Sequence, residues 1–407
     1  MVVAFAKASH PSKTATARAT ALFVTGDNTG PSILELLVYT GWGADIATCF
    51  DLCRDTRVNP NLWLLADAAR GRKRRTRLMQ ASATGDVKRL REMLAFPRVD
   101  VNRRDLNGLT ALSWASSNGH LPVVCELLDR GAFTLPSRKP DDVDVMPLHA
   151  AALAGHAHVV REPVARGADV NVRSFDGWQP LMSASYNGRA DVVMALLDLG
   201  ADVNARVDSG NMTSLMLAAT KGNMAAVCAL LAAPGIDIDL ENIYGRTALF
   251  FACERGHLDV VQALLNRGAS ARPSFGGDDF RSATPLSIAA TLGHMDVVRE
   301  FLARGTDINA VATGSNRTPL MLVATAGSAV GIAMLVECGA DVNVRTPRGT
   351  ALVEAATFGQ PEAVDALLAV PGIDLTITTR DGVTALQCAR IHGHPAIAAV
   401  LAAAMAH

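Results

Sequence analysis

Two histidine pairs have the spacing that comes nearest to metal chemistry in this chain. His156 and His158 stand two positions apart, as do His392 and His394, and imidazoles so placed can share a metal ion. A metal centre also needs a supporting set of ligands, whereas His156 and His394 each follow a glycine directly, which indicates a turn. The same Gly-His pair recurs at His120, His257 and His294. We therefore expect a structural role for these histidines, and neither a metal ion nor another cofactor.

Cysteines and paired acids likewise indicate no catalytic centre. Cys49 and Cys53 lie one helical turn apart, but no histidine or second cysteine pair completes a zinc site. The seven cysteines are scattered and never spaced C-x-x-C, which is typical of free thiols in a reducing compartment. The chain has no P-loop, no dinucleotide-binding glycine fingerprint and no G-x-S-x-G motif. No enzymatic activity is expected.

Charge and hydropathy exclude two classes of partner. Residues 1–77 hold 11 Lys and Arg against 6 Asp and Glu, and the remaining residues hold 27 against 33. An acidic body argues against nucleic acid, because neutralising phosphates dominates that affinity. No apolar run approaches the roughly 20 residues that cross a bilayer, so we expect no membrane span.

A repeat of about 34 residues organises the chain. Ten leucines recur at intervals of 32 to 37 residues, and a glycine stands seven positions after each of them. The leucines are Leu78, Leu112, Leu148, Leu181, Leu215, Leu249, Leu286, Leu320, Leu352 and Leu386. Alanine stands three positions after the leucine in nine of the ten units, which places both on one helical face.

The rest of each unit predicts a second helix and an extended loop. The pattern V-V-x-x-x-L-L, as in Val192–Leu197, gives that helix an apolar stripe, and the glycine before it suits a tight turn. Gly-Ala-Asp-Val-Asn then closes the unit at residues 167–171, 200–204 and 339–343. A single unit cannot bury both of its faces, so the units must stack.

These motifs resemble the ankyrin repeat family. Its pattern is present as Met146-Pro-Leu-His149, Gly155-His156 and Gly167-Ala-Asp-Val-Asn171, and again from Thr284 to Val298. The resemblance covers residues 76–407 and implies an all-α, right-handed α-solenoid of about ten repeats, each a helix-turn-helix with a β-turn finger. It further implies a monomeric, non-enzymatic scaffold that binds other proteins through the concave face of fingers and helices.

Two departures from the family pattern carry expectations of their own. Only His149 keeps the histidine that follows the leucine, so we expect a thinner polar network between repeats. Pro163 falls inside a second helix, where proline removes a hydrogen bond, so its repeat should be weak. Two long intervals place extra residues, including the acid pairs at 141–142 and 278–279, in loops at 133–145 and 271–283.

The N-terminal residues fall into two segments. Residues 1–30 lack acids up to position 26 and predict a disordered tail or a targeting segment. Residues 31–75 read as short helices that end in a basic linker, and Cys49–Cys53 with Leu62–Trp63 faintly resemble an F-box. That resemblance implies a ubiquitin-ligase adaptor as partner and a substrate-recognition subunit as function; the alternative is a helical cap on the first repeat. We expect a cytoplasmic protein, with the nucleus or an organelle as alternatives.

The resemblance also implies where partners bind. In ankyrin arrays they contact the residues flanking the finger glycine and the two residues before the turn glycine. Those positions are Phe175, Asp176, Trp178, Tyr186 and Asn187 in the fourth unit, Ile243, Tyr244, Arg246, Glu254 and Arg255 in the sixth, and Phe280 and Arg281 in the seventh. Tyr, Trp and Arg are the residues that most often anchor interfaces. The alternative is that these rings pack against neighbouring fingers and stiffen the array.

Overall fold

The computed structural model describes residues 76–96, 99–105, 108–134, 146–174, 176–208, 210–271, 284–312 and 315–406. The predicted tail, the F-box-like segment and the basic linker lie outside these residues. So do most of the two elongated loops and three of the predicted partner-binding residues, Phe175, Phe280 and Arg281.

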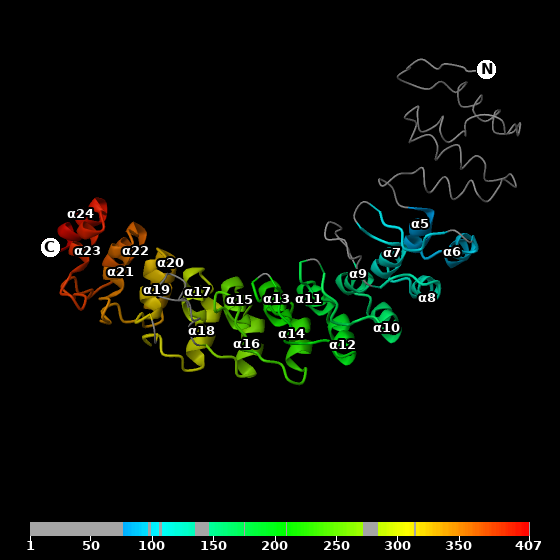
Figure 1. Ribbon diagram of the computed structural model, residues 1–407. Coiled ribbons are helices and arrows are strands. Elements are labelled where there is room, and N and C mark those ends of the chain that lie inside the picture. The colour runs from blue at the N-terminus through cyan, green and yellow to red at the C-terminus, as the bar shows by residue number, and fades with distance from the viewer. Residues whose placement is uncertain are drawn as a thin grey trace, which may run out of the picture. The chain divides into compact units, whose positions relative to one another are not determined.

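Helices in ten successive pairs account for the regular structure of the described residues (Figure 1). The first helices of the repeats are α5 (Arg77–Thr84), α7 (Ala111–Ser117), α9 (Pro147–Ala154), α11 (Pro180–Tyr186), α13 (Ser214–Lys221), α15 (Ala248–Arg255), α17 (Pro285–Thr291), α19 (Pro319–Thr325), α21 (Ala351–Thr357) and α23 (Ala385–Ile391). The second helices are α6 (Val87–Leu94), α8 (Leu121–Asp129), α10 (Ala157–Ala165), α12 (Ala190–Asp198), α14 (Met224–Leu231), α16 (Leu258–Asn266), α18 (Met295–Ala303), α20 (Ala329–Glu337), α22 (Pro361–Leu368) and α24 (Pro395–Ala404). The all-α repeat architecture is confirmed. Over the described part of the chain, no helix is both long and apolar enough to cross a membrane.

The start and turn of each pair follow from local chemistry. The hydroxyls of Thr213 and Thr247 accept the backbone N–H groups three residues on and so cap α13 and α15. Gly222 ends α13 with a φ of 69°, in the left-handed region that favours glycine. A Cβ at Gly222 would also lie 2.6 Å from the His257 ring, so this glycine is required for space as well as for conformation.

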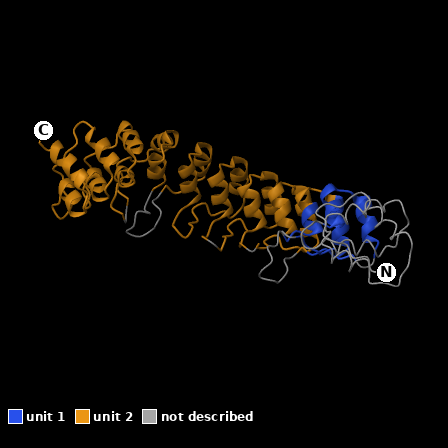
Figure 2. Cartoon of the chain, turned by 90° about the horizontal axis from the view of Figure 1, so that it is seen from above, with its two compact units in different colours: residues 1–115, 122–133 blue, residues 116–121, 134–407 orange. Residues whose placement is uncertain are grey.

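The chain divides into two compact units (Figure 2). Unit 1 is residues 1–115 and 122–133, and its described part holds α5, α6 and most of α7 and α8. Within it the Arg130 guanidinium donates to the Leu94 carbonyl at 2.7 Å, and Arg91 pairs with Glu126 at 2.8 Å. Unit 2 is residues 116–121 and 134–407 and holds repeats 3 to 10.

Unit 2 packs its first helices in one row and its second helices in another (Figure 1). The repeated leucines are buried between the rows, as at Leu181 and Leu215, together with the alanines three positions later, as at Ala184. The paired valines of the second helices are buried as well, as at Val192 and Val193. The periodicity of the sequence is thus the periodicity of the core.

Side chains other than the histidine after the leucine also make hydrogen bonds between repeats. Asn204 donates to the Gly235 carbonyl at 2.8 Å and accepts from the Asp237 N–H at 2.9 Å, and Asn343 makes the same two bonds to the loop after repeat 9. The residue after the turn glycine adds a further bond, as when Gln360 donates to the Thr325 carbonyl at 3.0 Å. Asparagine and glutamine side chains therefore contribute to the polar network between repeats that the sequence predicts to be thin.

Helix α10 continues through Pro163, which is buried. The Pro163 carbonyl accepts the Ala168 N–H at 2.9 Å, as the Leu196 carbonyl accepts the Ala201 N–H at the same distance in the next repeat. The proline therefore removes its own N–H without breaking the helix. Whether its repeat is weak stays a prediction.

Helix α20 packs closely on the first helix of the preceding repeat, α17. Gly331 lies at this contact, where an added Cβ would stand 2.6 Å from the Ala290 carbonyl oxygen and 2.6 Å from Cγ1 of Val323. Since a backbone carbonyl in a helix cannot move aside cheaply, the approach of α20 to α17 requires glycine at this position.

Candidate functional site

We use the name finger face for the surface of unit 2 formed by the finger loops and the last turns of the first helices. Hydrogen bonds across each finger fix its shape. In repeat 4 the Ser174 N–H donates to the Trp178 carbonyl at 2.8 Å, and in repeat 6 the Asn242 N–H donates to the Arg246 carbonyl at 3.0 Å. The Ile243 N–H then donates to the Gly210 carbonyl of repeat 5 at 3.2 Å, which ties one finger to the next.

Trp178 and Tyr186 lie together on the finger face of repeat 4 and are both partly buried. Their rings meet edge to face, with centroids 5.6 Å apart and an interplanar angle of 81°. Both pack against a buried apolar cluster of Met182, Ala205, Val207 and Leu217. The Lys221 ammonium lies 4.5 Å from the Tyr186 centroid, a cation–π contact. These two rings therefore join repeats 4 and 5, as the packing alternative expects.

A buried histidine of the preceding repeat hydrogen-bonds to the same finger. His149 Nε2 lies 2.8 Å from the Trp178 carbonyl oxygen, so this nitrogen carries the hydrogen and donates it. Burial lowers the pKa of His149, although its hydrogen bond to the Trp178 backbone acts in the opposite direction. The neutral imidazole therefore holds the Trp178 finger in place.

Ile243 and Tyr244 stand at the tip of the repeat 6 finger and are 58% and 46% exposed. The Asn242 side chain holds the loop beneath them, since its Oδ1 accepts the N–H groups of Tyr244 and Arg246 at 2.9 Å each. Two large apolar side chains are thus presented to solvent on a loop fixed by its own hydrogen bonds. A rigid exposed anchor of this kind loses little conformational entropy on binding.

Charges surround this tip. Arg246 lies over the Phe250 ring at 4.7 Å, and its guanidinium reaches Glu254 at 3.5 Å. Arg255 approaches the same carboxylate at 3.9 Å and remains exposed. Two arginines therefore share the Glu254 carboxylate beside the exposed tip.

The remaining predicted residues of repeat 4 play smaller parts. Asp176 is exposed on the finger, and the Asn187 side chain donates to the Ser183 carbonyl at 2.8 Å, which closes the end of α11. The predicted residues of repeats 4 and 6 form two groups on the finger face, with the helices of repeat 5 between them. The structure thus divides the predicted surface into a packed part at Trp178 and an exposed part at Ile243 and Tyr244.

The histidines considered for metal binding have structural hydrogen bonds. His156 Nε2 lies 3.1 Å from the Ser117 carbonyl oxygen, and His394 Nε2 lies 3.2 Å from that of Thr357. Across the described ranges, no group of three or more His, Cys, Asp and Glu side chains is placed to hold a metal ion. Burial raises the pKa of the Cys253 thiol on α15, which keeps it protonated and unsuited to nucleophilic attack.

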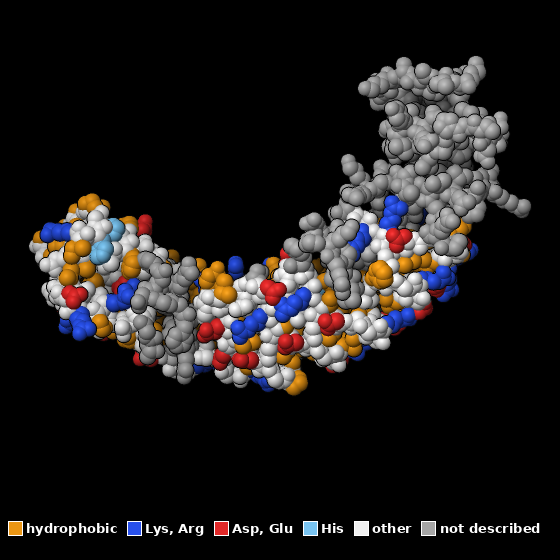
Figure 3. All heavy atoms as spheres, in the orientation of Figure 1, with side chains coloured by type: hydrophobic (Ala, Val, Ile, Leu, Met, Phe, Trp, Pro, Cys, Tyr) orange, Lys and Arg blue, Asp and Glu red, His pale blue; other side chains and the backbone are white. Residues whose placement is uncertain are grey.

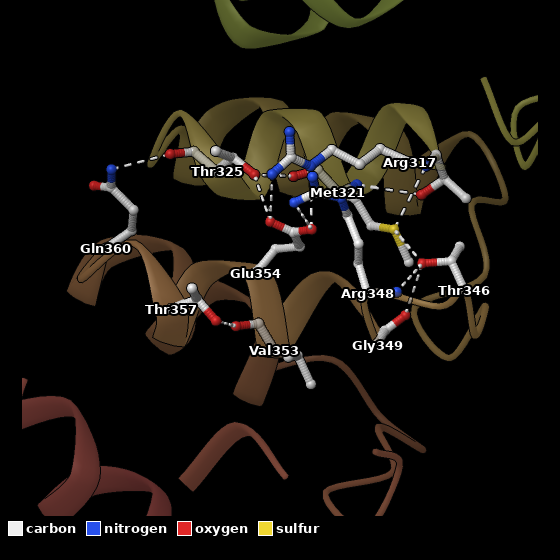
Figure 4. Close-up of polar contacts among 11 residues, drawn as sticks. Arg317, Met321, Thr325, Thr346, Arg348, Gly349, Val353, Glu354, Thr357 and Gln360 are labelled. Carbon is white, nitrogen blue, oxygen red and sulfur yellow. Dashed lines mark hydrogen bonds and ion pairs between the residues drawn. The ribbon is translucent and has the colours of Figure 1, made fainter. Parts of the chain in front are cut away.

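Sequence reasoning missed a buried ion pair between repeats 8 and 9. Arg317 and Glu354 are 2% and 3% exposed, and two parallel bonds join them, from Nε to Oε1 at 3.1 Å and from Nη2 to Oε2 at 3.0 Å. Figure 4 shows the carboxylate directed toward both the guanidinium and the Thr325 hydroxyl, and this hydroxyl lies 3.5 Å from Oε2. The available signal was an acid two positions after the repeated leucine, where all nine other units have an uncharged residue.

Exposed apolar residues on other repeats were missed as well. Leu153, Leu292 and Ile391 stand one or two positions before the turn glycine and are exposed. They occupy the same positions as Tyr186 and Asn187. Applying that positional rule to all ten repeats would have found them.

Comparison with known families identifies the class of protein. The profile described as "Ankyrin repeats (3 copies)" matches residues 30–137, 133–207, 215–312, 273–346 and 320–407, nearly the whole chain. The chain belongs to the ankyrin repeat family. The first matched stretch begins at residue 30, whereas the sequence predicts that the repeat array starts at residue 76. That start stays a prediction.

Among curated proteins, the chain is similar to "Palmitoyltransferase Hip14" of Drosophila melanogaster, with 35% identity over 216 residues, 52% of this chain and 32% of that protein. It is similar to "Palmitoyltransferase ZDHHC17" of Danio rerio, with 34% identity over 210 residues, 51% of this chain and 33% of that protein. It is also similar to human "Ankyrin repeat domain-containing protein 49", with 40% identity over 60 residues, 15% of this chain and 24% of that protein. The chain spans about a third of the length of the two palmitoyltransferases that it matches.

Proposed function

We propose that this chain is a non-enzymatic scaffold that binds partner proteins through the finger face of repeats 4 to 6. The observation that carries the proposal is the exposed pair Ile243 and Tyr244 on a loop held by Asn242. Exposed aromatic and aliphatic side chains beside arginine are the combination that anchors protein interfaces. The Trp178 ring packs between repeats 4 and 5 and so supports this surface, and we expect it to contribute less to partner contact than Ile243 and Tyr244.

The absence of a reactive arrangement on this surface favours binding over catalysis. Arg246 is engaged with Glu254 and Phe250, and the nearby thiol of Cys253 is buried and protonated. Two of the relatives are named palmitoyltransferases, and the chain matches about a third of the length of each. For this chain we propose the recognition of proteins, without the transfer chemistry.

The test compares substitutions at two surfaces whose apolar side chains are similarly exposed. The double variant Ile243→Ala/Tyr244→Ala removes the exposed anchors, and Met194→Ala removes a 48% exposed apolar side chain from the second-row helix α12. Captured proteins are identified by quantitative mass spectrometry with the wild-type chain and with both variants. We expect the double variant to lose a partner that the Met194 variant keeps, with a loss of about 2 kcal/mol or more in its affinity.

Thermal unfolding of the same three proteins separates binding from folding. Since all three substituted side chains are exposed, the melting temperatures should agree closely. Equal retention of every captured protein by the double variant would refute the proposed surface.

A further inference from the structure

The finger face of repeats 9 and 10 carries a second group of basic and apolar side chains, separate from the repeat 6 finger. We call it the C-terminal arginine surface. It consists of Arg345 and Arg348 on the finger of repeat 9, Arg380 on the finger of repeat 10, Phe358 at the end of α21 and Ile391 at the end of α23. Figure 3 shows basic, acidic, hydrophobic and histidine side chains on the visible face of the C-terminal repeats.

The positive charge of Arg348 is not neutralised by the acid nearest to it. Both oxygens of Glu354 are held by the buried Arg317, so that pair carries no net charge. Arg348 extends toward the same carboxylate, with Nη1 3.9 Å from Oε1, too far for a hydrogen bond (Figure 4). Its side chain is 36% exposed, and its guanidinium makes no hydrogen bond to any described residue. Its donors are therefore open to an anionic ligand.

The other two arginines extend this charge across both fingers. Arg345 Nε donates to the Thr378 carbonyl at 3.1 Å, which fixes the side chain while leaving it exposed. The Arg380 backbone N–H donates to the Pro347 carbonyl at 2.9 Å, and its exposed guanidinium has no ion pair within the described ranges. Two exposed acids, Asp374 and Asp381, lie on the loop that carries Arg380, and neither forms an ion pair with the three arginines among the described residues.

Apolar side chains lie next to these charges. Ile391 is 68% exposed, among the most exposed large apolar residues that the structure describes. The Phe358 ring is backed by the Arg317 guanidinium, whose central carbon lies 5.6 Å from the ring centroid. The buried ion pair therefore supports the Phe358 ring before any ligand arrives, which lowers the entropy lost on binding.

We propose that the C-terminal arginine surface binds an acidic segment of a partner protein that carries an apolar side chain. Carboxylates of the segment pair with Arg348 and Arg380, and its apolar side chain packs against Phe358 and Ile391. The proposal rests on the proposed function only in that the ligand is a protein. It concerns different repeats, so the two can fail separately.

The test uses the full chain and a defined probe. The probe is a fluorescein-labelled peptide in which a Leu-Leu pair is flanked by glutamates, and its counterpart has lysines in place of the glutamates. Fluorescence anisotropy should show binding of the glutamate peptide at least about tenfold tighter than of the lysine peptide, with an affinity that falls as salt rises. Arg348→Gln/Arg380→Gln and, separately, Ile391→Ser should each weaken it by about tenfold or more.

Three comparisons make the result decisive. Lys88→Gln removes an exposed cation from α6 in unit 1 and should leave peptide binding unchanged, as should Ile243→Ala/Tyr244→Ala. If Arg348→Gln/Arg380→Gln does not fold, Arg380→Gln alone replaces it, because the Arg380 guanidinium has no ion pair within the described ranges. Equal binding of both peptides, undiminished binding by the arginine variants, loss of binding in the repeat 6 variant, or tighter binding of an oligothymidine would each overturn the proposal.

Discussion

At the scale of single residues, the buried side chain of His149 has a partner from the neighbouring repeat for only one of its two ring nitrogens. His149 lies under the repeat 4 finger with Nε2 bonded to the Trp178 carbonyl, and its Nδ1 is buried without a hydrogen-bond partner among the described residues. Protonation would add a charge and a donor with no acceptor at that site, at a cost of about 1–3 kcal/mol for the unmet donor alone.

The stability of unit 2 should therefore fall in mild acid. Because burial holds the pKa of His149 below its ordinary value, the unfolded chain binds the proton more readily. Stability is complete above the unfolded pKa of about 6.5 and declines as the pH drops from there toward the lower folded value. Urea unfolding at several pH values should show a shallower decline in His149→Gln than in the wild type. Identical slopes would show that other groups set the pH dependence.

The buried pair Arg317–Glu354 yields the second prediction at this scale. Arg317→Met should destabilise the chain by about 3 kcal/mol, because it leaves a carboxylate buried without its bidentate partner. The approach of Arg348 keeps the loss at the lower end of the usual range. The double variant Arg317→Met/Glu354→Leu should recover most of the loss in denaturant unfolding. A double variant as unstable as the single one would mean that the site cannot accommodate an apolar pair.

At the scale of elements, the contact of α20 with α17 depends on the absence of a side chain at Gly331. Gly331→Ala should destabilise unit 2 by about 1–3 kcal/mol even though alanine is the better helix former, because its Cβ would meet the Ala290 carbonyl at 2.6 Å. Val330→Ala, at the neighbouring exposed position of α20, should stay within about 0.5 kcal/mol of the wild type. A stabilised Gly331→Ala variant would show that α20 can move away from α17 freely.

Pro163 gives the converse case within α10. The helix accepts the proline but leaves the Val159 carbonyl without its usual donor, so Pro163→Leu should raise the unfolding free energy by about 1 kcal/mol. Amide hydrogen exchange in the wild type should be faster in this repeat than in its neighbours. A lower unfolding midpoint in the leucine variant would mean that the backbone has adapted to the proline.

Elements follow from the sequence more completely than contacts do. The leucine–glycine spacing predicts both helices and the turn of each repeat, since those depend on residues within one unit. Arg317 and Glu354 are 37 positions apart and meet only once repeats 8 and 9 have stacked, so their pairing could not be predicted from either repeat alone. The family pattern predicts the partner-binding positions, but which of them are exposed depends on packing: Trp178 lies on a buried cluster, whereas Tyr244 is 46% exposed.

At the scale of the whole molecule, stability should be a sum of repeats and nearest-neighbour interfaces. Removing repeats 9 and 10, from Gly349 onward, should leave the earlier repeats folded, though less soluble because a face of repeat 8 is uncovered. The truncation deletes Glu354 but exposes Arg317 to water in the same step, so no unpaired charge remains buried. Circular dichroism should retain the helical signal of the remaining repeats; complete loss of that signal would indicate a single cooperative core.

The asparagine bonds from loop to loop also determine how unit 2 would respond to a mechanical load. Asn204 and Asn343 each clamp one loop to the next, and no such clamp reaches beyond its neighbour. Tension applied at the two ends would load these interfaces in series, so the weakest would yield first and the molecule would lengthen in steps of one repeat. The interface between repeats 8 and 9, which alone among those described adds a buried bidentate ion pair, would release a guanidinium and a carboxylate to water when it parts. Unit 2 would then lengthen one interface at a time, and the interface with the ion pair lies beneath the C-terminal arginine surface.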